Sequence, residues 1–286
     1  KKTIQSIKNH HPNITLAFYS EDDMFNKTNQ SIYFRNCLPE YDICFTTKSY
    51  NLLPNELPSL GAKNIFFIDK AYDRNYHVPL KLSLNDHKRF DSDITFIGSY
   101  ESSRSDLMYY LAINGLKVNI FGNGWERCKL RHHNFILKNQ PLYGKDFIKA
   151  ICASKINLNF LRKENRDLQT DRSIEIPACS GFMLAERTPE HKYLFEEGKE
   201  AEFFDITNKN ELLHKCKYYL ANENERLSIC KNGLARVKSS DYSHHSRIRV
   251  MLKEIYKTKD LNRKYKRISY VSPGIFHSFD IANALN

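Results

Sequence analysis

The chain has 286 residues, of which 44 are Lys or Arg and 33 are Asp or Glu, so its formal net charge at pH 7 is +11. Hydrophobic residues make up 41% of the composition and aromatic residues 13%, which excludes a wholly disordered protein. The longest apolar runs, such as residues 65–68, are far shorter than the roughly 18 residues of a membrane-spanning helix. The positive charge is compatible with nucleic acid, an anionic membrane or a phosphorylated small molecule as partner, and equally with a solvated basic surface.

Seven cysteines are scattered along the chain, and none forms a C-x-x-C pair. An odd number without paired spacing is typical of a reducing compartment rather than of a disulfide-stabilised protein. The first residues, KKTIQSIKNHH, are basic and lack the apolar centre of a secretory signal peptide. We therefore expect a cytoplasmic protein.

Short β-rich runs alternate with helical segments in the first part of the chain. The expected strands are residues 14–19, 41–46 and 63–68, and the expected helices are 28–38 and 49–60. Pro54 and Pro58 interrupt the second of these helices. Residues 72–89 contain prolines and histidines without a hydrophobic period, which indicates a linker.

A second alternating series follows this linker. Its expected strands are residues 93–98, 117–121, 134–137, 155–161, 182–185 and 201–205. Its expected helices lie around Leu107, at 144–154, 171–179 and 190–195, and in three further segments that end near residue 255. Strands and helices that alternate at this spacing predict βαβ units, so the expected class is α/β with two Rossmann-like lobes of parallel sheet that face each other.

We expect an N-terminal lobe at residues 1–88, a C-terminal lobe at 89–260 and a tail at 261–286 that crosses back to the first lobe. The first lobe has only about three expected strands, and the chain begins with Lys1 rather than Met. We therefore expect the N-terminal lobe to be incomplete.

The loop after Leu161 is the first candidate site, because ligands of open parallel sheets bind beyond the carboxyl ends of strands. This charged loop enters a helix at Thr170 and Asp171, where Thr170 can cap the helix and free N–H groups can hold a phosphate, so both are candidate ligand contacts. Arg172 opposes the helix dipole at a cost of about 0.3–1 kcal/mol, which indicates a nearby anion. Glu175 lies on the same face, so a simple surface ion pair is the alternative.

Several ordered motifs resemble a known family. Asp167 and Glu175 have seven residues between them, which is similar to the E-x7-E motif of GT-B glycosyltransferases. The segments that resemble the glycosyltransferase domain of the spore maturation protein CgeB family are R-x-x-E-I-P-A-C-S-G-F-M-L-A-E at 172–186, F-E-E-G-K-E at 195–200, K-N-G at 231–233, D-I-T-F-I-G-S at 93–99 and I-F-G-N-G-W at 120–125. The resemblance covers roughly residues 14 to 256.

The resemblance implies a GT-B fold with a nucleotide-diphosphate sugar held mainly by the second lobe. In this family pattern, Glu175 contacts the ribose hydroxyls of the donor, and Arg172 and Arg104 contact its diphosphate. Asp167 stands near the sugar where the pattern has Glu, and this shorter side chain leaves its catalytic role open. Asp167 and Glu175 are the candidate catalytic residues.

Two glycine-containing turns add candidate donor contacts. Gly98 ends a strand and allows the backbone to approach a ligand closely, and Gly122 precedes Asn123 in a tight turn after the next strand. Trp125 follows this turn and is placed to stack against a nucleobase, with a core position under the loop as an equal alternative. Gly98, Gly122, Asn123 and Trp125 are therefore candidate donor-binding residues.

No histidine pair has the i,i+4 spacing of a helical metal site, because the pairs at 10–11, 132–133 and 244–245 are adjacent residues. We expect no metal ligands and no cofactor, with the nucleotide sugar as donor substrate. The acidic run at 21–23 follows a strand, where it lines the acceptor side of a cleft or forms a solvated loop.

Together with these residues, the resemblance implies a metal-independent glycosyltransferase that acts on a glycan or lipid-linked acceptor. The stereochemistry is open, and the resemblance of the Asp167–Glu175 spacing to the family motif favours retention. The alternative is a non-catalytic glycan- or nucleotide-binding protein with the same fold, which Asp167 in place of Glu slightly favours. Because the basic residues are spread along the chain, we expect no nucleic-acid partner. The basic, aromatic strip at 253–267 is compatible with peripheral contact at the inner face of an anionic membrane, or with a solvated helix end.

Overall fold

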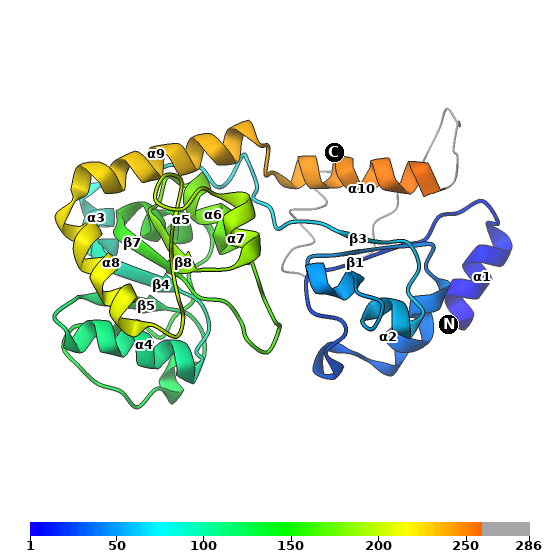
Figure 1. Ribbon diagram of the computed structural model, residues 1–286, viewed down its shortest axis with the longest axis horizontal. Coiled ribbons are helices and arrows are strands. Elements are labelled where there is room, and N and C mark those ends of the chain that lie inside the picture. The colour runs from blue at the N-terminus through cyan, green and yellow to red at the C-terminus, as the bar shows by residue number, and fades with distance from the viewer. Residues whose placement is uncertain (259–286) are drawn as a thin grey trace. The chain divides into compact units, whose positions relative to one another are not determined.

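The computed structural model describes residues 1–258, which fall into two units (Figure 1). Unit 1 contains Lys1–Ala71, Arg162–Asp167 and the described residues from Ser243, and unit 2 contains Tyr72–Leu161 and Leu168–Tyr242. This division differs from the boundary expected after residue 88, since residues 72–88 lie in unit 2. The expected tail at 261–286 lies outside the described residues.

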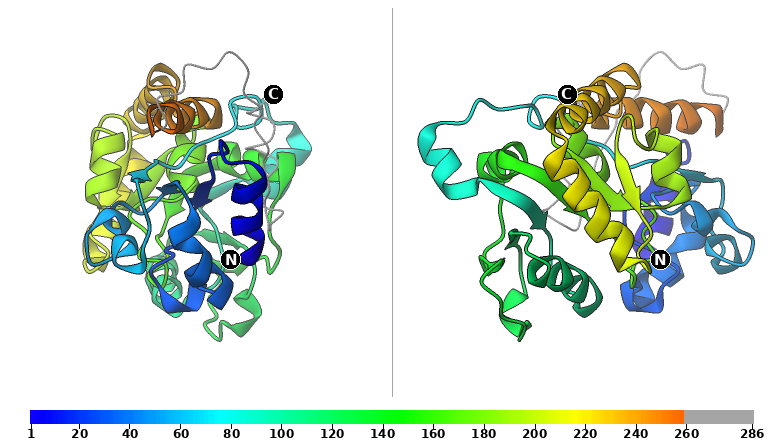
Figure 2. Two further views of the ribbon diagram at one scale, coloured as in Figure 1. Left: turned by 90° about the vertical axis from the view of Figure 1, so that its right-hand side faces the viewer. Right: turned by 60° about the vertical axis from the view of Figure 1, so that its left-hand side comes forward.

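Unit 1 is built on a three-stranded parallel sheet. Its strands, in sheet order, are β1 (Ala17–Ser20), β2 (Ile43–Thr46) and β3 (Ile65–Phe67), and its helices are α1 (Lys2–His10), α2 (Ile32–Cys37) and α10 (His244–Thr258). Every residue of β2 is buried, as expected for a central parallel strand that is covered on both faces. Met251 and Ile255 of α10 pack with Ile43 and Phe45 on one face, while α2 covers the other (Figures 1 and 2).

The expected helix at residues 49–60 is wrong. This segment forms two short 3-10 helices, Ser49–Leu52 and Leu57–Leu60. Pro54 and Pro58 explain the difference, because each lacks the N–H that a continuous α-helix requires. Helix α1 was not predicted, and it contains no buried residue whose spacing would have revealed it.

Unit 2 is built on a six-stranded parallel sheet, and all six of its expected strands are confirmed. In chain order they are β4 (Ser92–Ile97), β5 (Val118–Phe121), β6 (Phe135–Leu137), β7 (Ser154–Asn159), β8 (Met183–Glu186) and β9 (Glu202–Phe204). The helices are α3 (Leu84–Phe90), α4 (Ser102–Ile113), α5 (Gly144–Ala153), α6 (Arg172–Ala178), α7 (Pro189–Leu194), α8 (Lys209–Ala221) and α9 (Glu223–Ser239).

Helix α3 lies in the segment that was expected to be a linker. A capping box fixes its start, because Ser83 Oγ accepts the Asp86 N–H and the Asp86 carboxylate accepts the Ser83 N–H in return. Helices cover both faces of the six-stranded sheet: α4 and α8 pack on one, and α5, α6 and α7 on the other (Figure 1). Unit 2 is therefore a three-layer α/β/α structure.

The sheet order in unit 2 is β6-β5-β4-β7-β8-β9. The chain runs outward from β4 through β5 to β6, returns to β7 beside β4, and then runs outward on the other side. This is the doubly wound order of Rossmann folds, which reverses between β4 and β7. Ligands of such sheets bind at the carboxyl ends of the strands at the reversal, so the segments after β4 and β7 are the positions to inspect.

Candidate functional site

Four side chains form an ordered cluster around α6, in the chain that follows β7. Arg172 Nη1 donates to Glu175 Oε2 at 2.5 Å, and the Arg172 guanidinium lies 4.4 Å from the centre of the Phe147 ring on α5. His77 Nε2 lies 3.3 Å from Glu175 Oε1. Because His77 Nδ1 accepts the Asp73 N–H, the ring proton is on Nε2 and points to Glu175. We call His77, Phe147, Arg172 and Glu175 the α6 cluster.

The α6 cluster contains an ion pair between Arg172 and Glu175, which was the alternative that their spacing in the sequence offered. Both oxygens of the Glu175 carboxylate are engaged, one by Arg172 and one by His77. The Arg172 side chain remains 35% exposed, so part of its guanidinium is accessible to an anion. The cluster therefore offers one fixed carboxylate and one partly accessible cation.

A buried hydrogen-bond network holds the turn that begins α6. Thr170 Oγ1 donates to Asn159 Oδ1 and no side chain caps the helix, so the expected cap by Thr170 is wrong. Ser173 Oγ accepts the Thr170 N–H and lies 2.7 Å from His191 Nε2. Because His191 Nδ1 contacts the Glu186 carbonyl oxygen, Nδ1 carries the ring proton and Ser173 donates to Nε2. Burial lowers the pKa of His191 to about 4, so this imidazole is neutral at pH 7.

Gly98, Gly122 and Trp125 lie together at the carboxyl end of β4. Gly122 has a φ of +146°, and a Cβ atom there would lie 1.9 Å from the Gly98 carbonyl oxygen. Trp125 Nε1 donates to the same oxygen at 2.8 Å. Trp125 is 0% exposed, so no face of its ring is available to a nucleobase. The structure corrects the stacking expectation: Trp125 is the core residue beneath the loop.

We predict that Gly122→Ala destabilises the protein by about 2 kcal/mol more than Gly115→Ala. Both glycines have a positive φ, but nothing lies within 4 Å of a Cβ added at Gly115. Gly115→Ala therefore measures the backbone strain alone, and Gly122→Ala adds the clash with Gly98. Urea unfolding monitored by Trp125 fluorescence compares the two, and equal losses would contradict the packing argument.

Arg104 is a buried residue that connects two loops. Its Nη2 donates to Glu101 Oε1 at 2.6 Å and to the Leu161 carbonyl oxygen at 3.1 Å, and Nη1 donates to Ser99. With 5% exposure and protein acceptors on both terminal nitrogens, Arg104 does not support the expected diphosphate contact. It joins the ends of β4 and β7 instead.

Asn123 and Asp171 are the last two candidate donor contacts in unit 2, and they lie on opposite sides of the point between β4 and β7 where the sheet order reverses. Asn123 is exposed in the loop after β5, where its carbonyl oxygen accepts the Tyr100 N–H at 2.9 Å. Asp171 is half-buried at the N-cap position of α6 and makes no side-chain cap bond. Neither contributes to the α6 cluster.

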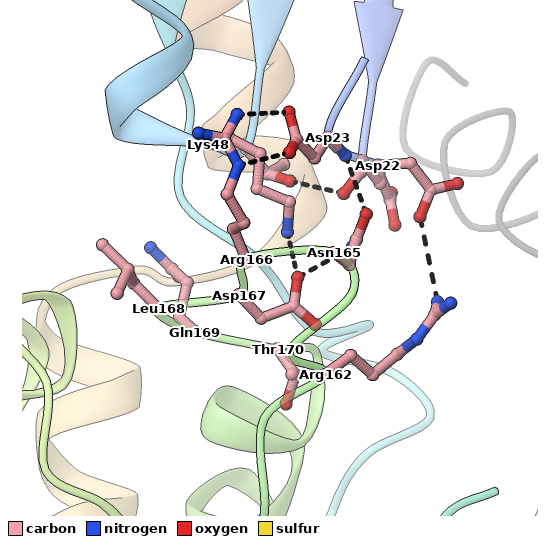
Figure 3. A network of polar contacts seen from close by, with 12 residues as sticks. Asp22, Asp23, Lys48, Arg162, Asn165, Arg166, Asp167, Leu168, Gln169 and Thr170 are labelled. Carbon is pink, nitrogen blue, oxygen red and sulfur yellow. Dashed lines mark hydrogen bonds and ion pairs between the residues drawn. The ribbon is translucent and has the colours of Figure 1, made fainter. Parts of the chain in front are cut away.

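Asp167 lies in unit 1, in the segment Arg162–Asp167. Its Oδ1 accepts hydrogen bonds from Lys48 Nζ and from Asn165 Nδ2, the latter at 2.8 Å (Figure 3). The side chains of Lys48 and Asp167 are 1% and 5% exposed, so this is a buried ion pair. Because Lys48 follows β2 by two residues, the pair stands at the carboxyl edge of the unit 1 sheet.

A second charged network surrounds Arg166. Its guanidinium donates to both Asp23 and Glu56 at 2.6–3.0 Å, and it lies 4.2 Å from the centre of the Tyr50 ring. Figure 3 shows the two hydrogen bonds from Arg166 to Asp23. Asn51 Nδ2 also donates to both carboxylates. Burial alone would raise the pKa of Asp23, but hydrogen bonds from Arg166 and Asn51 and the charge of Arg166 lower it below its usual value. We call these residues the Arg166 network.

The contacts of Asp23 and Glu21 correct the expectation of a solvated loop for the acidic run at residues 21–23. Asp23 is 0% exposed and ion-paired, and Glu21 Oε2 pairs with Lys70 Nζ at 2.8 Å. A solvated loop is therefore wrong for these two carboxylates.

Sequence reasoning missed Lys48, His77 and Phe147. Lys48 lies two residues after a predicted strand, and its place near the carboxyl end of that strand was a usable signal. His77 lies in the segment interpreted as a linker, and Phe147 is one of several apolar residues on α5. Only the tertiary fold brings these two side chains to Glu175 and Arg172.

Within residues 1–258, no three His, Cys, Asp or Glu side chains are grouped so that they could hold a metal ion. All seven cysteines are free thiols. In this part of the chain, no helix combines the length and apolarity needed to cross a membrane.

A family model described as glycosyl transferase-like matches residues 104–253, slightly more than half of the chain. No curated protein matches the sequence. Among solved structures, TarM has a TM-score of 0.62 and 16% identity, with 86% of this chain and 51% of TarM covered. HepE from Anabaena, solved with UDP-glucose, has a TM-score of 0.64 and 10% identity, with 91% and 77% covered.

Sucrose-phosphate synthase from Thermosynechococcus elongatus has a TM-score of 0.60 and 11% identity, with 88% of this chain and 70% of that protein covered. The match to TarM covers 51% of that protein, so this chain spans about half of its length. At these identities the likeness is one of fold, and it confirms the predicted α/β class of GT-B type with Rossmann-like units of parallel sheet. Given the family match over more than half of its length, the chain belongs to the glycosyl transferase-like family.

Proposed function

We propose that the protein transfers a sugar from a nucleotide-diphosphate sugar to a glycan or envelope-polysaccharide acceptor. The observation that carries the proposal is the α6 cluster of this chain. The cluster places a fixed carboxylate, Glu175, and a partly accessible cation, Arg172, in the chain after β7, where the sheet order reverses. In this role Arg172 contacts the donor diphosphate and Glu175 accepts hydrogen bonds from the ribose hydroxyls. The resemblance at residues 172–186 further supports a CgeB-like affiliation.

A UDP-sugar is the first donor that we propose. HepE was solved with UDP-glucose and with UDP, and a variant of S. aureus TarM was solved with UDP and alpha-GlcNAc-glycerol. The proposed reaction needs no metal, since Arg172 places a positive charge where the leaving diphosphate gains negative charge. Asp167, oriented by Lys48, is proposed to act near the sugar in a retaining transfer.

We expect one of the UDP-, GDP- and dTDP-sugars to bind in isothermal titration calorimetry and to release its nucleotide when a suitable glycan is added, whereas binding of a CMP-sugar alone would contradict a diphosphate contact. Turnover should be the same with and without EDTA, because the cationic side chain replaces a metal at the diphosphate. NMR of the product reports whether the anomeric configuration is retained. If no sugar nucleotide binds, the donor-site proposal is wrong, and binding without turnover on any acceptor favours a non-catalytic binding protein.

The location is proposed on separate grounds. Seven free cysteines suit a reducing compartment, so we propose the cytoplasm. Peripheral contact with an anionic membrane through residues 253–267 stays a prediction, and most of that strip lies outside the described residues.

A further inference from the structure

Three polar side chains lie in a row across the centre of the six-stranded sheet. Thr95 on β4 pairs in register with Asn119 on β5 and with Asn157 on β7. Register partners on neighbouring parallel strands point to the same face, so the three side chains share one buried face. They are between 1% and 4% exposed. Among the described residues, Thr95 Oγ1, Asn119 Oδ1 and Asn157 Oδ1 have no hydrogen-bond partner.

A cavity of about 10 Å³ lies next to this row. Thr95, Asn157 and Arg172 are its polar lining residues, and Phe147, Ile151 and Ile176 are among its apolar ones. A space of this size accommodates about one water molecule. The cavity is therefore large enough for one water-sized ligand, and its polar lining residues come from two strands and from α6.

Arg172, which lines the same cavity, carries a complementary atom. Its Nε is buried and has no hydrogen-bond partner among the described residues, although Nη1 binds Glu175 and the guanidinium packs on Phe147. An arginine Nε–H only donates, and an amide oxygen such as Asn157 Oδ1 only accepts. A buried polar atom that lacks a partner costs about 1–3 kcal/mol, so three such atoms on residues that line one cavity favour an occupant that pairs with them.

We propose that one structural water occupies this cavity, donates to Thr95 Oγ1 and Asn157 Oδ1, and accepts from Arg172 Nε–H. Water fits because it offers donors and an acceptor at once and makes about three hydrogen bonds at buried sites. A cation is disfavoured by the charge of Arg172, and an anion by the oxygen of Asn157. Thr95 and Asn157 thus become positioning residues that fix the Arg172 guanidinium from the sheet.

The effect of this water on donor binding rests on the proposed function, whereas the presence of the water does not. If Arg172 contacts a donor diphosphate, the water keeps the guanidinium in one orientation before the donor arrives. Preorganisation of this kind increases affinity because less freedom is lost on binding. The water itself depends only on the geometry of unit 2.

Thr95→Val is the deciding variant, because valine has the shape of threonine and no other hydrogen bond of the Thr95 side chain is lost. Without a bound water, the substitution removes an unpartnered buried hydroxyl and raises the melting temperature or leaves it unchanged. With the water, it removes one of three bonds and lowers the melting temperature by about 2–4 °C. We expect the lower value, and a rise or no change would overturn the inference.

Nucleotide affinity provides the second readout. We expect Thr95→Val to raise the Kd for UDP about fivefold and to leave the weaker affinity for uridine unchanged. Ser154→Ala is the matched control, since it removes another buried hydroxyl of the same sheet, which donates to the Ile156 carbonyl oxygen. This control should lose stability and keep the wild-type Kd for UDP, and the same Kd change in both variants would contradict a positioning role.

A crystal structure of the full chain that resolves ordered water completes the test. We expect a density peak within hydrogen-bond distance of Thr95 Oγ1, Asn157 Oδ1 and Arg172 Nε, and direct bonds among these atoms would overturn the inference. If wild type binds no UDP, the proposed function fails, while the density and the sign of the Thr95→Val shift still decide the water site.

Discussion

Arg166→Ala should destabilise unit 1 by about 3 kcal/mol, the lower end of the usual loss when one partner of a buried ion pair is removed, because the Arg166 side chain is itself 41% exposed. The substitution leaves Asp23, which is 0% exposed, and the nearly buried Glu56 side by side without their shared cation. Arg166 also has a φ of +45°, a strained conformation that its hydrogen bonds help to hold. The single Trp lies in unit 2, so hydrogen exchange of the β1, β2 and β3 amides is the appropriate measurement.

The pH dependence separates charge loss from simple loss of packing. In the wild type the pKa of Asp23 is below its unfolded value, so the folded state binds fewer protons. The stabilisation is present above the unfolded pKa of about 3.9 and is lost as the pH falls through the lower folded pKa. In Arg166→Ala, burial without the guanidinium raises the pKa of Asp23, so the carboxyl can become neutral. The difference in stability between the two proteins should therefore shrink between pH 7 and pH 4.

Arg162→Ala is the matched control, because it removes an arginine from the same loop. Arg162 Nη1 lies 3.9 Å from Asp22 Oδ1, and both side chains are more than half exposed. Surface pairs of this kind contribute about 0–1 kcal/mol. Comparable protection losses in both variants would contradict a structural role for the Arg166 network, and a loss in Arg166→Ala that does not change with pH would contradict a role of its charge.

The strands were predictable because buried parallel strands carry a strong local signal. DITFIG and KINLNFL are short apolar runs flanked by polar turns, and they became β4 and β7 at the centre of the sheet. Helix α1 and the segment at 49–60 were not predictable in the same way. Helix α1 has no buried residue. The structure of the segment at 49–60 depends on how its two prolines divide a helical pattern. The grouping of Arg162–Asp167 with unit 1 depends on tertiary contacts of Asn165, Arg166 and Asp167, which no local pattern contains.

The candidate site was predictable only where its partners are neighbours in sequence. Arg172 and Glu175 are three residues apart on one helix, so their pairing followed from helical geometry. His77 reaches Glu175 from almost a hundred positions away, and sequence alone offers no register for such a contact. The structure does not support the expected donor contacts of Arg104 and Trp125, for a related reason. A residue type suited to a ligand is equally suited to bridging loops or filling a core, and only burial distinguishes the roles.

Arg172→Ala should lower kcat/KM for the nucleotide-sugar donor about 10- to 100-fold. Removing a charge-assisted contact costs about 1.5–3 kcal/mol, and about 1.4 kcal/mol corresponds to a tenfold change. Because the proposed partner is the diphosphate, the loss should also appear in the Kd for UDP and should be absent for uridine. Steady-state kinetics with the donor identified by calorimetry, together with titrations of UDP and uridine, measure the effect.

Lys155→Ala is the matched control, since Lys155 is also an ion-paired cation of unit 2. Lys155 Nζ lies 2.7 Å from Asp93 Oδ1, where both residues begin their strands at the amino edge of the sheet, opposite the carboxyl edge that holds the proposed site. If net charge alone attracted the donor, both variants would lose similar affinity, and the loss would diminish with added salt. A loss confined to Arg172→Ala and to ligands with a diphosphate instead identifies a direct contact. No other role proposed for Arg172 predicts a loss that is selective for diphosphate ligands. Unchanged kcat/KM in Arg172→Ala would therefore contradict the assignment of the α6 cluster to the donor site.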